Sequence, residues 1–186
     1  MGCLMEKLLA NSVIAAVRSR ESFDEAVKSG SELIFDLAPD ISDISEKAKI
    51  SHAAGKKLFI HLDLASGIGK DKSGIDYVRS MGVDGIISTR ANIIKLSREA
   101  GLHTVQRFFA VDSQSVATAV ESRKNSKADM IEIMPGVIPK VISELREQVN
   151  VPIIAGGLIE SEAEVKSVIA AGAAAVSTGK KSLWKR

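Results

Sequence analysis

Cysteine and aromatic residues are scarce in this chain of 186 residues. The lone cysteine, Cys3, excludes an internal disulfide and a cysteine metal site, and it favours a reducing compartment. Aromatic residues make up only 4% of the chain, whereas proteins that bind single-stranded RNA commonly stack its bases on exposed aromatics. The scarcity argues against a surface built from many stacking residues.

A large excess of one charge and a long apolar run are also missing. The formal net charge is +2, and a protein that held nucleic acid mainly through phosphate contacts would show a stronger basic excess. No apolar stretch is long enough to span a bilayer. A signal peptide is not recognisable, and Glu6 stands where a myristoylation motif needs serine or threonine. We therefore expect a cytoplasmic protein that has no membrane partner.

Linker composition is absent as well. No Pro-rich, Ser-rich or single-charge block separates two halves of the chain. With 45% hydrophobic and 26% charged residues, the composition is that of an ordinary globular protein. We predict a single domain over residues 1–186.

Eight short apolar runs alternate with helix-like stretches. Such alternation predicts parallel βαβ units in an α/β protein, and a count of eight favours a compact (β/α)8 TIM barrel over an open sheet. The chain is short for this fold, which usually has about 250 residues, so its helices and loops must be lean. The predicted strands are 13–17, 33–37, 58–64, 85–89, 104–109, 130–134, 152–157 and 174–177.

Polar residues mark several helix starts. Residues 22–25 and 161–164 fit capping boxes, in which side chains satisfy the free amides of the first turn. Apolar residues on one side of 92–100 predict a helix that lies on the sheet. Only 182–186 follow the last strand, so the final helix is short or incomplete. We expect a partner chain to cover the barrel wall there, which would make the protein a homo-oligomer.

Polar side chains follow most of the predicted strands. In a TIM barrel the carboxyl ends of the strands converge on one mouth, where these side chains form a charged pocket. His61 and Asp63 share a strand face, so they can act as a base with its orienting group or as two ligands of a divalent metal. Alternatively, the carboxylates and arginines only pair with one another as a structural network. The pocket candidates are Asp36, His61, Asp63, Ser88, Arg90, Arg107 and Glu132.

Glycines end the last two strands. Many TIM barrels bind a phosphate between these two loops, because glycine lets backbone amides approach the oxygens and a following helical turn adds a favourable dipole. The alternative is that the glycines serve only a tight turn after the strand. The predicted phosphate-binding residues are Gly156, Gly157, Ser177, Thr178 and Gly179.

A catalytic constellation is not recognisable. A Schiff-base lyase needs a desolvated lysine at a strand end, but the sixth strand offers Glu132. We therefore assign no catalytic residue, no cofactor and no metal. The alternative is a small lyase or isomerase of a phosphorylated three-carbon or sugar ligand, with His61, Asp63 and Glu132 as acid-base groups.

Several motifs follow one another in a specific order along nearly the whole chain. They are AAVR at 15–18, KLFIHLDLASG at 57–67, GIISTR at 85–90, QRFF at 106–109, IEIMPG at 131–136 and PIIAGG at 152–157. In this series the chain resembles the glycerol uptake operon antiterminator regulatory proteins. The resemblance implies a regulator that responds to glycerol 3-phosphate and acts on leader mRNA, so that transcription passes a terminator.

The implied ligand agrees with the pocket predicted from the residues. Glycerol 3-phosphate would place its phosphate at the glycine loops and its hydroxyls near His61 and the carboxylates. Arg18, Arg90 and Arg107 would neutralise the carboxylates or the phosphate. The basic end of the chain is the candidate for RNA contact, although such ends are usually only solvated. It consists of Lys180, Lys181, Lys185 and Arg186.

Overall fold

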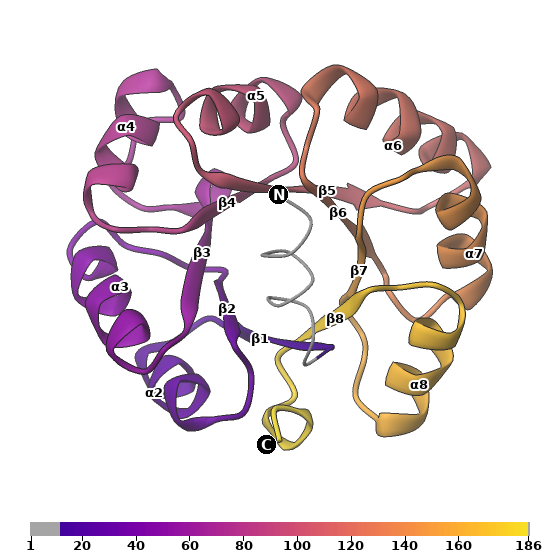
Figure 1. Ribbon diagram of the computed structural model, residues 1–186, viewed down its shortest axis with the longest axis horizontal. Helices are drawn as coiled ribbons and strands as arrows, with labels where there is room; N and C mark the ends of the chain where they lie inside the picture. The colour runs from indigo at the N-terminus through magenta and orange to yellow at the C-terminus, as the bar shows by residue number, and fades with distance from the viewer. Residues whose placement is uncertain (1–11, 186) are drawn as a thin grey trace.

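The computed structural model describes residues 12–185. Eight parallel strands form a closed barrel in which each strand pairs with its neighbours in chain order and β8 pairs with β1 (Figure 1). The predicted TIM barrel is confirmed. The strands are β1 (Val13–Val17), β2 (Leu33–Asp36), β3 (Lys57–His61), β4 (Gly85–Ser88), β5 (His103–Phe109), β6 (Met130–Met134), β7 (Ile153–Gly156) and β8 (Ala175–Thr178).

Helices surround the barrel on its outside (Figure 1). The predicted third strand is too long at its end, because residues 62–64 form a short 3₁₀ turn, η1 (Leu62–Leu64). A second such turn, η2 (Lys181–Leu183), follows the last strand. The helices are α2 (Arg20–Lys28), α3 (Ile44–Ala53), α4 (Lys72–Ser80), α5 (Ala91–Glu99), α6 (Ser113–Ser126), α7 (Pro139–Gln148) and α8 (Glu162–Ala170).

The two predicted capping boxes have different outcomes. At α8 the prediction is confirmed, since the Glu164 amide donates to Ser161 Oγ and the Glu164 carboxylate accepts from the Ser161 amide. The predicted start at Ser22 is wrong, because α2 begins one turn earlier. Ser19 caps this helix and Ser22 is its third residue, with each hydroxyl accepting a backbone amide of the other residue.

Apolar side chains form an inner core inside the barrel and outer layers between strands and helices. Successive residues of a strand point to opposite faces, so Phe59 belongs to the inner core and Ile60 to an outer layer. Phe35 and Phe59 stack inside the barrel with ring centroids 5.8 Å apart. This alternation decides which residues at the strand ends face the mouth. The inner core contains Ile14, Ala16, Leu33, Phe35, Leu37, Phe59, Ile87, Val105, Met130, Ile154 and Ala175.

The short closing segment seals the barrel wall between α2 and α8. Trp184 is buried there, its indole N–H donates to the Thr178 carbonyl over 2.8 Å, and its own carbonyl accepts from the Gly30 amide. Figure 1 shows this segment, in yellow near the C label, beside α2. The predicted short final helix is confirmed, but one tryptophan side chain of the same chain fills the space where we expected a partner.

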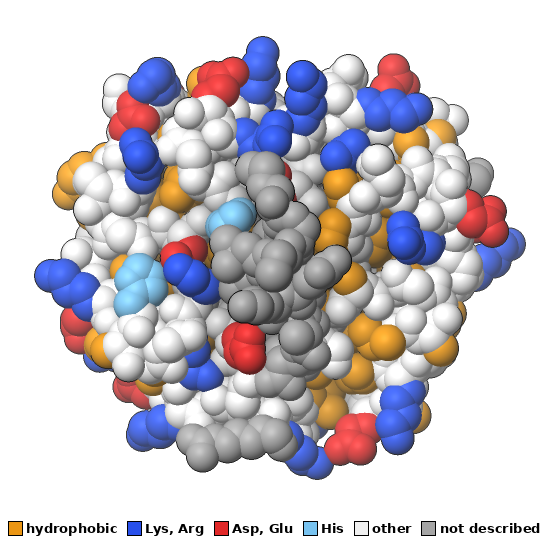
Figure 2. Space-filling view, in the orientation of Figure 1, with side chains coloured by type: hydrophobic (Ala, Val, Ile, Leu, Met, Phe, Trp, Pro, Cys, Tyr) orange, Lys and Arg blue, Asp and Glu red, His pale blue; other side chains and the backbone are white. Residues whose placement is uncertain are grey.

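Charged side chains of both signs lie around the periphery of the face seen in Figure 2. This mixture agrees with the small net charge of the chain. Within residues 12–185, none of the helices combines the length and the apolar character that crossing a bilayer requires.

Candidate functional site

An ion pair lies inside the barrel where β5 and β6 end. Arg107 and Glu132 are paired in register, and Arg107 Nε donates to Glu132 Oε2 over 2.7 Å. Both side chains are almost completely buried. Residues two positions apart on a strand point to the same face, and Val105 and Met130 belong to the inner core. Arg107 and Glu132 therefore point into the barrel as well, where the pair forms the floor of the mouth.

His61 ends β3 on the same inner face. Its side chain is 4% exposed, and its Nδ1 has no hydrogen-bond partner among residues 12–185. Burial, together with the positive charges of Arg107 and Arg18, lowers the pKa of His61 to about 4, although Asp63 opposes the shift. The imidazole is therefore neutral near pH 7, with a ring nitrogen free to bond a ligand.

Asp63 joins the segments that follow β3 and β4. It accepts hydrogen bonds from the Ser88 hydroxyl at 2.7 Å and from the Thr89 amide at 2.8 Å, and the Thr89 hydroxyl donates to it as well. Burial alone would raise the pKa of Asp63, but these donors hold it below its usual value. Arg90 Nε lies 3.5 Å from the same carboxylate. The carboxylate is thus ionised and largely occupied by its own chain.

The glycine at the end of β7 makes room for the carboxylate of Glu132. A Cβ atom on Gly156 would overlap Glu132 Oε1, which is buried and has no hydrogen-bond partner in the described part of the chain. Buried polar atoms are almost always paired in proteins. Glu132 Oε1, an acceptor, and His61 Nδ1, a donor or an acceptor according to the tautomer, are therefore two positions that bound hydroxyl groups would satisfy.

The loop after β7 has an unusual backbone. Gly157 has φ +77° and Leu158 has φ +61°, so two successive residues adopt the left-handed conformation. Leu158 is also exposed. Non-glycine residues adopt this conformation rarely and mostly where the structure over-determines it, as at ligand-binding loops. The phosphate site and the simple turn both stay open as roles of the predicted glycine pair.

Thr178 ties the loop after β7 to the end of β8. Its hydroxyl donates to the Ile159 carbonyl over 2.7 Å and accepts from the Lys180 amide. Ser177 is buried and faces the barrel interior, as Ala175 does. Gly179 follows beside the Ala16 carbonyl. All five predicted phosphate-binding residues therefore lie at neighbouring strand ends, but the Thr178 hydroxyl already has two partners.

One predicted pocket residue lies outside the mouth. Asp36 shares its strand face with Ile34 of the outer layer, and it accepts from Lys47 Nζ of α3 over 2.8 Å. Asp43 lies 2.9 Å from the same ammonium group. Asp36 therefore anchors α3 to β2, and the structure does not bring it together with the other candidates.

The remaining predictions concern exposed basic residues. Arg18 and Arg90 lie at the rim of the mouth, and Arg90 has a side chain 50% exposed. At the end of the chain, Lys181 pairs with Glu21 and Glu25, and Lys185 pairs with Glu162. Arg186 lies outside the described residues. Lys180 forms no ion pair within residues 12–185.

Two residues at the mouth were missed by the sequence analysis. The Lys70 ammonium group donates to the Ala65 carbonyl. Burial is the main reason why the pKa of Lys70 is lowered; Asp63 raises this pKa and Arg90 lowers it, so the ammonium group lies near both of these charges. Phe109, at the end of β5, is 55% exposed. The position of Lys70 in a loop does not indicate in the sequence that it lies at the mouth. Phe109 lies two residues after Arg107 on the same strand, so it faces the same side, and the sequence could have predicted its place at the mouth.

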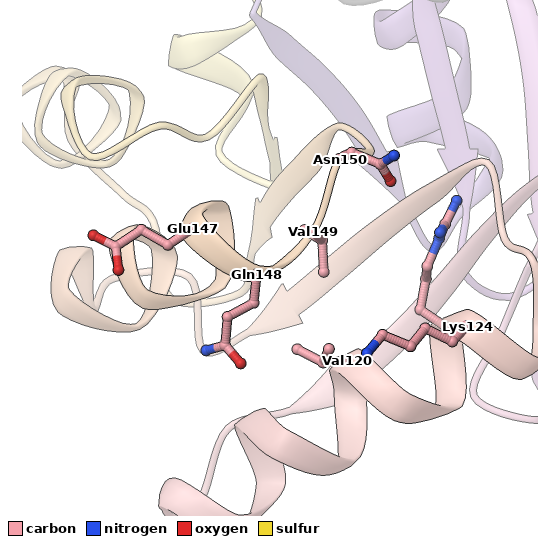
Figure 3. Close-up of a pocket in the computed structure, with 7 residues that line it drawn as sticks. Val120, Lys124, Glu147, Gln148, Val149 and Asn150 are labelled. Atoms are coloured by element: carbon pink, nitrogen blue, oxygen red, sulfur yellow. The ribbon is translucent and has the colours of Figure 1, made fainter.

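Two cavities open on the described surface. One, of about 400 Å³, adjoins the mouth between the ends of β4 and β5 and the start of α6. The other, of about 380 Å³, lies between the last turns of α6 and α7, where Val120 and Lys124 face Gln148 and Val149 (Figure 3). Asn150 precedes β7, so the second cavity is at the opposite end of the barrel from the mouth.

A metal centre lacks enough ligands. Within residues 12–185, no group of three or more histidine, cysteine, aspartate or glutamate side chains could hold a metal ion. His61 and Asp63 have no third ligand of this kind beside them. The mouth thus brings together a buried ion pair, a neutral histidine and a glycine loop.

Comparison with known proteins agrees with these features. The model of the glycerol-3-phosphate responsive antiterminator family matches residues 13–184. A glycerol uptake operon antiterminator regulatory protein of Listeria monocytogenes shares 33% identity, with a TM-score of 0.87 over 93% of this chain and 94% of that one. An antiterminator-related protein of Thermotoga maritima shares 31% identity, with a TM-score of 0.84 over 94% and 98% of the two chains.

A relative from a further organism extends the comparison. The uncharacterised protein YgcP of Escherichia coli K12 is 37% identical over 182 residues, which are 97% of this chain and 95% of that protein. The family match and these identities cover almost every described residue, including the whole mouth. The chain belongs to the glycerol-3-phosphate responsive antiterminator family.

Proposed function

We propose that the protein binds glycerol 3-phosphate in the mouth of its barrel and, in the bound form, acts on leader mRNA of glycerol-utilisation operons as a transcription antiterminator. Family membership supports the regulatory class and the ligand. The RNA partner is inferred from the antiterminator relatives, which share about a third of their residues with this chain. An RNA partner made during transcription puts the site of action in the cytoplasm.

The phosphate is assigned to the loops after β7 and β8. Gly157 leaves the chain without a side chain at a left-handed position, and the Thr178 hydroxyl bonds the two loops to each other. Backbone amides can approach an oxyanion closely only where no Cβ intervenes. We assign Gly156, Gly157, Ser177 and Gly179 to the phosphate and Thr178 to holding the loops in position.

The glycerol part is assigned to the floor of the mouth. The observation that supports the proposal most is the pair of buried polar atoms without partners among residues 12–185, Glu132 Oε1 and His61 Nδ1. Glycerol 3-phosphate carries hydroxyl groups that can hydrogen-bond with both, and Arg107 holds the Glu132 carboxylate in position. Asp63, Ser88 and Arg90 position the loop above, and Arg18 adds positive charge at the rim.

An acid-base enzyme is the competing function. A general base works best with a pKa near the operating pH, but the pKa of His61 is about 4 and that of Asp63 is lowered. Glu132 is held by Arg107. These properties favour binding of the ligand over its conversion.

Two measurements test the proposal. Calorimetric titration with glycerol 3-phosphate should give saturable binding, and the ligand recovered afterwards should be unchanged. Retention of a glycerol-operon leader transcript on the protein should increase when glycerol 3-phosphate is added, because only a difference in affinity between the two forms can make the protein a switch. Turnover of the ligand without RNA retention would replace the regulator by an enzyme.

The basic chain end is a weaker part of the RNA proposal. Lys181 and Lys185 are already neutralised by acidic side chains of α2 and α8. Lys180 follows β8 at the same end of the barrel as the mouth and is exposed. Of the predicted cluster, we therefore assign a phosphate contact with RNA to Lys180 first.

A further inference from the structure

We propose that the cavity beside Phe109 binds an unpaired base of the RNA, and that the phosphate loop controls this site through Met134. The inference rests on the proposed function, and it names where RNA binds and how the ligand is sensed. Its support is an exposed aromatic ring, a mainly apolar cavity with polar side chains in its wall, basic residues at the same end of the barrel and a chain of contacts to the ligand loop.

Phe109 is exposed against the trend of this chain. Phe23, Phe35 and Phe59 are fully buried and Phe108 is partly buried, whereas Phe109 is 55% exposed at the end of β5. Val111, two residues later, is exposed as well. An aromatic ring standing in water beside a cavity is the usual platform on which single-stranded RNA stacks a base.

The cavity has the size and the polar groups that a nucleobase needs. Its volume of about 400 Å³ falls in the range of small-molecule sites. The side chain of Gln114 is exposed there and offers an amide donor and a carbonyl acceptor to a base edge. The Asp112 carboxylate is already occupied by the amide and hydroxyl of Ser115, so it shapes the wall. The lining residues are Thr89, Arg107, Phe108, Phe109, Asp112, Gln114, Ser115 and Thr118.

Basic side chains lie on the same end of the barrel. Arg90 follows Thr89 of the cavity wall and has half of its side chain exposed, and Arg18 and Lys180 form no ion pair within residues 12–185. A polyanion complements these charges. If a second copy of this chain docked through the same surface in a twofold pair, the basic residues of the two copies would lie close together and repel one another. Charge thus favours RNA as the occupant over self-association.

Contacts connect the cavity to the phosphate loop. Phe109 is paired in register with Met134, and the Ala110 amide donates to the Met134 carbonyl over 2.8 Å. The Met134 side chain packs against Gly157, since a Cβ there would lie 2.8 Å from Met134 Cε. An anion drawn onto the loop of Gly157 therefore changes the packing of Met134, and with it the end of β5 that presents Phe109.

Phe109→Ala tests the stacking site. With saturating glycerol 3-phosphate, its affinity for the leader transcript should fall about 5- to 150-fold, the range for loss of one stacked base, while its affinity for glycerol 3-phosphate stays that of the wild type. The matched control is Tyr77→Ala, which removes an aromatic ring that is 50% exposed on α4. This control should bind RNA as the wild type does, and Phe109→Trp should retain most of the affinity.

Other outcomes separate this inference from the proposed function. If the wild type binds RNA in response to glycerol 3-phosphate and Phe109→Ala binds equally well, the cavity is not the site, but the proposed function stands. If the wild type binds no RNA under any ligand concentration, both are overturned. Wild-type dimers that dissociate on Phe109→Ala substitution, with unchanged RNA affinity, would assign the surface to a second copy.

Met134→Ala tests the connection. This variant should bind glycerol 3-phosphate and RNA separately, because Met134 is assigned to neither ligand. The ratio of RNA affinities with and without glycerol 3-phosphate should fall toward one. A ratio equal to that of the wild type would overturn the route through Met134.

Discussion

Single residues decide the protonation state of the mouth, and His61 is the clearest case. Its pKa is about 4 in the folded protein and 6.5 in an exposed chain, so only the unfolded state gains a proton between these values. The stabilising contribution of neutral His61 is therefore complete above pH 6.5 and is lost as the pH falls toward 4. Its full size is about 3 kcal/mol.

We predict that His61→Asn removes this part of the pH dependence. Between pH 7.5 and 4.5, the wild type should lose about 2.5 kcal/mol more of its free energy of unfolding than the variant does, measured by urea denaturation at both pH values. Parallel losses in wild type and His61→Asn would show that His61 titrates normally.

Gly157 is the residue on which the phosphate assignment depends. We predict that Gly157→Val abolishes glycerol 3-phosphate binding in calorimetry, because the new side chain strains the left-handed backbone and collides with Met134. Gly101→Val is the matched control, with φ +82° but open space around the Cβ position. It should lose stability yet keep ligand affinity. Full affinity in folded Gly157→Val would remove the phosphate from this loop.

Among the elements, β5 and β6 supply the ion pair on which the floor of the mouth depends. We predict that Arg107→Met lowers the free energy of unfolding by about 3–5 kcal/mol, because it leaves the Glu132 carboxylate buried without its partner. Adding Glu132→Gln to this variant should recover part of the loss in urea denaturation. Lys72→Ala, which removes an exposed pair with Asp76 on α4, should change stability by less than about 1 kcal/mol.

The short turn η2 and Trp184, the residue that follows it, cover the barrel wall between α2 and α8 in place of a full helix. We predict that Trp184→Ala lowers the free energy of unfolding by about 3–5 kcal/mol. The substitution leaves a cavity in the barrel wall and removes the hydrogen bond to the Thr178 carbonyl. Lys185→Ala removes only an exposed ion pair with Glu162, so it should remain within about 1 kcal/mol of the wild type. A Trp184→Ala variant as stable as the wild type would mean that the segment does not close the wall.

At the scale of the whole molecule, ligand and fold are linked. Glycerol 3-phosphate at a hundred times its dissociation constant should stabilise the native protein by about 2.7 kcal/mol, if it binds only the folded state. Thermal unfolding with and without ligand measures this shift, and glycerol with inorganic sulfate is the control. An unchanged melting temperature at saturating ligand would contradict binding to the native barrel.

The homo-oligomer stays a prediction, but the reason for it, a barrel wall that a partner chain must cover, no longer applies. Trp184 fills the place in the wall that a partner chain was expected to cover. Sedimentation equilibrium of the wild type gives the mass directly. A monomer would end that prediction and leave the regulator proposal intact, because the pocket is formed by one chain.

Local sequence was enough to predict the order and number of strands and most of the residues that lie at the mouth. Apolar runs can be read locally, since each must bury its side chains wherever the chain goes. Parity within a strand also places Arg107 and Glu132 on inner faces. The glycine pair after β7 was found for the same reason, because a left-handed residue leaves a local signature.

The partners of these residues depend on how the folded chain brings distant segments together. Asp36 lies on the outer face of β2, where it pairs with Lys47 of α3. The Thr178 hydroxyl donates to the Ile159 carbonyl. Trp184 reaches the wall from a segment that looks too short to close it. Such pairings join positions distant in the chain, and burial then sets the charge state of His61, so neither could be read from local sequence.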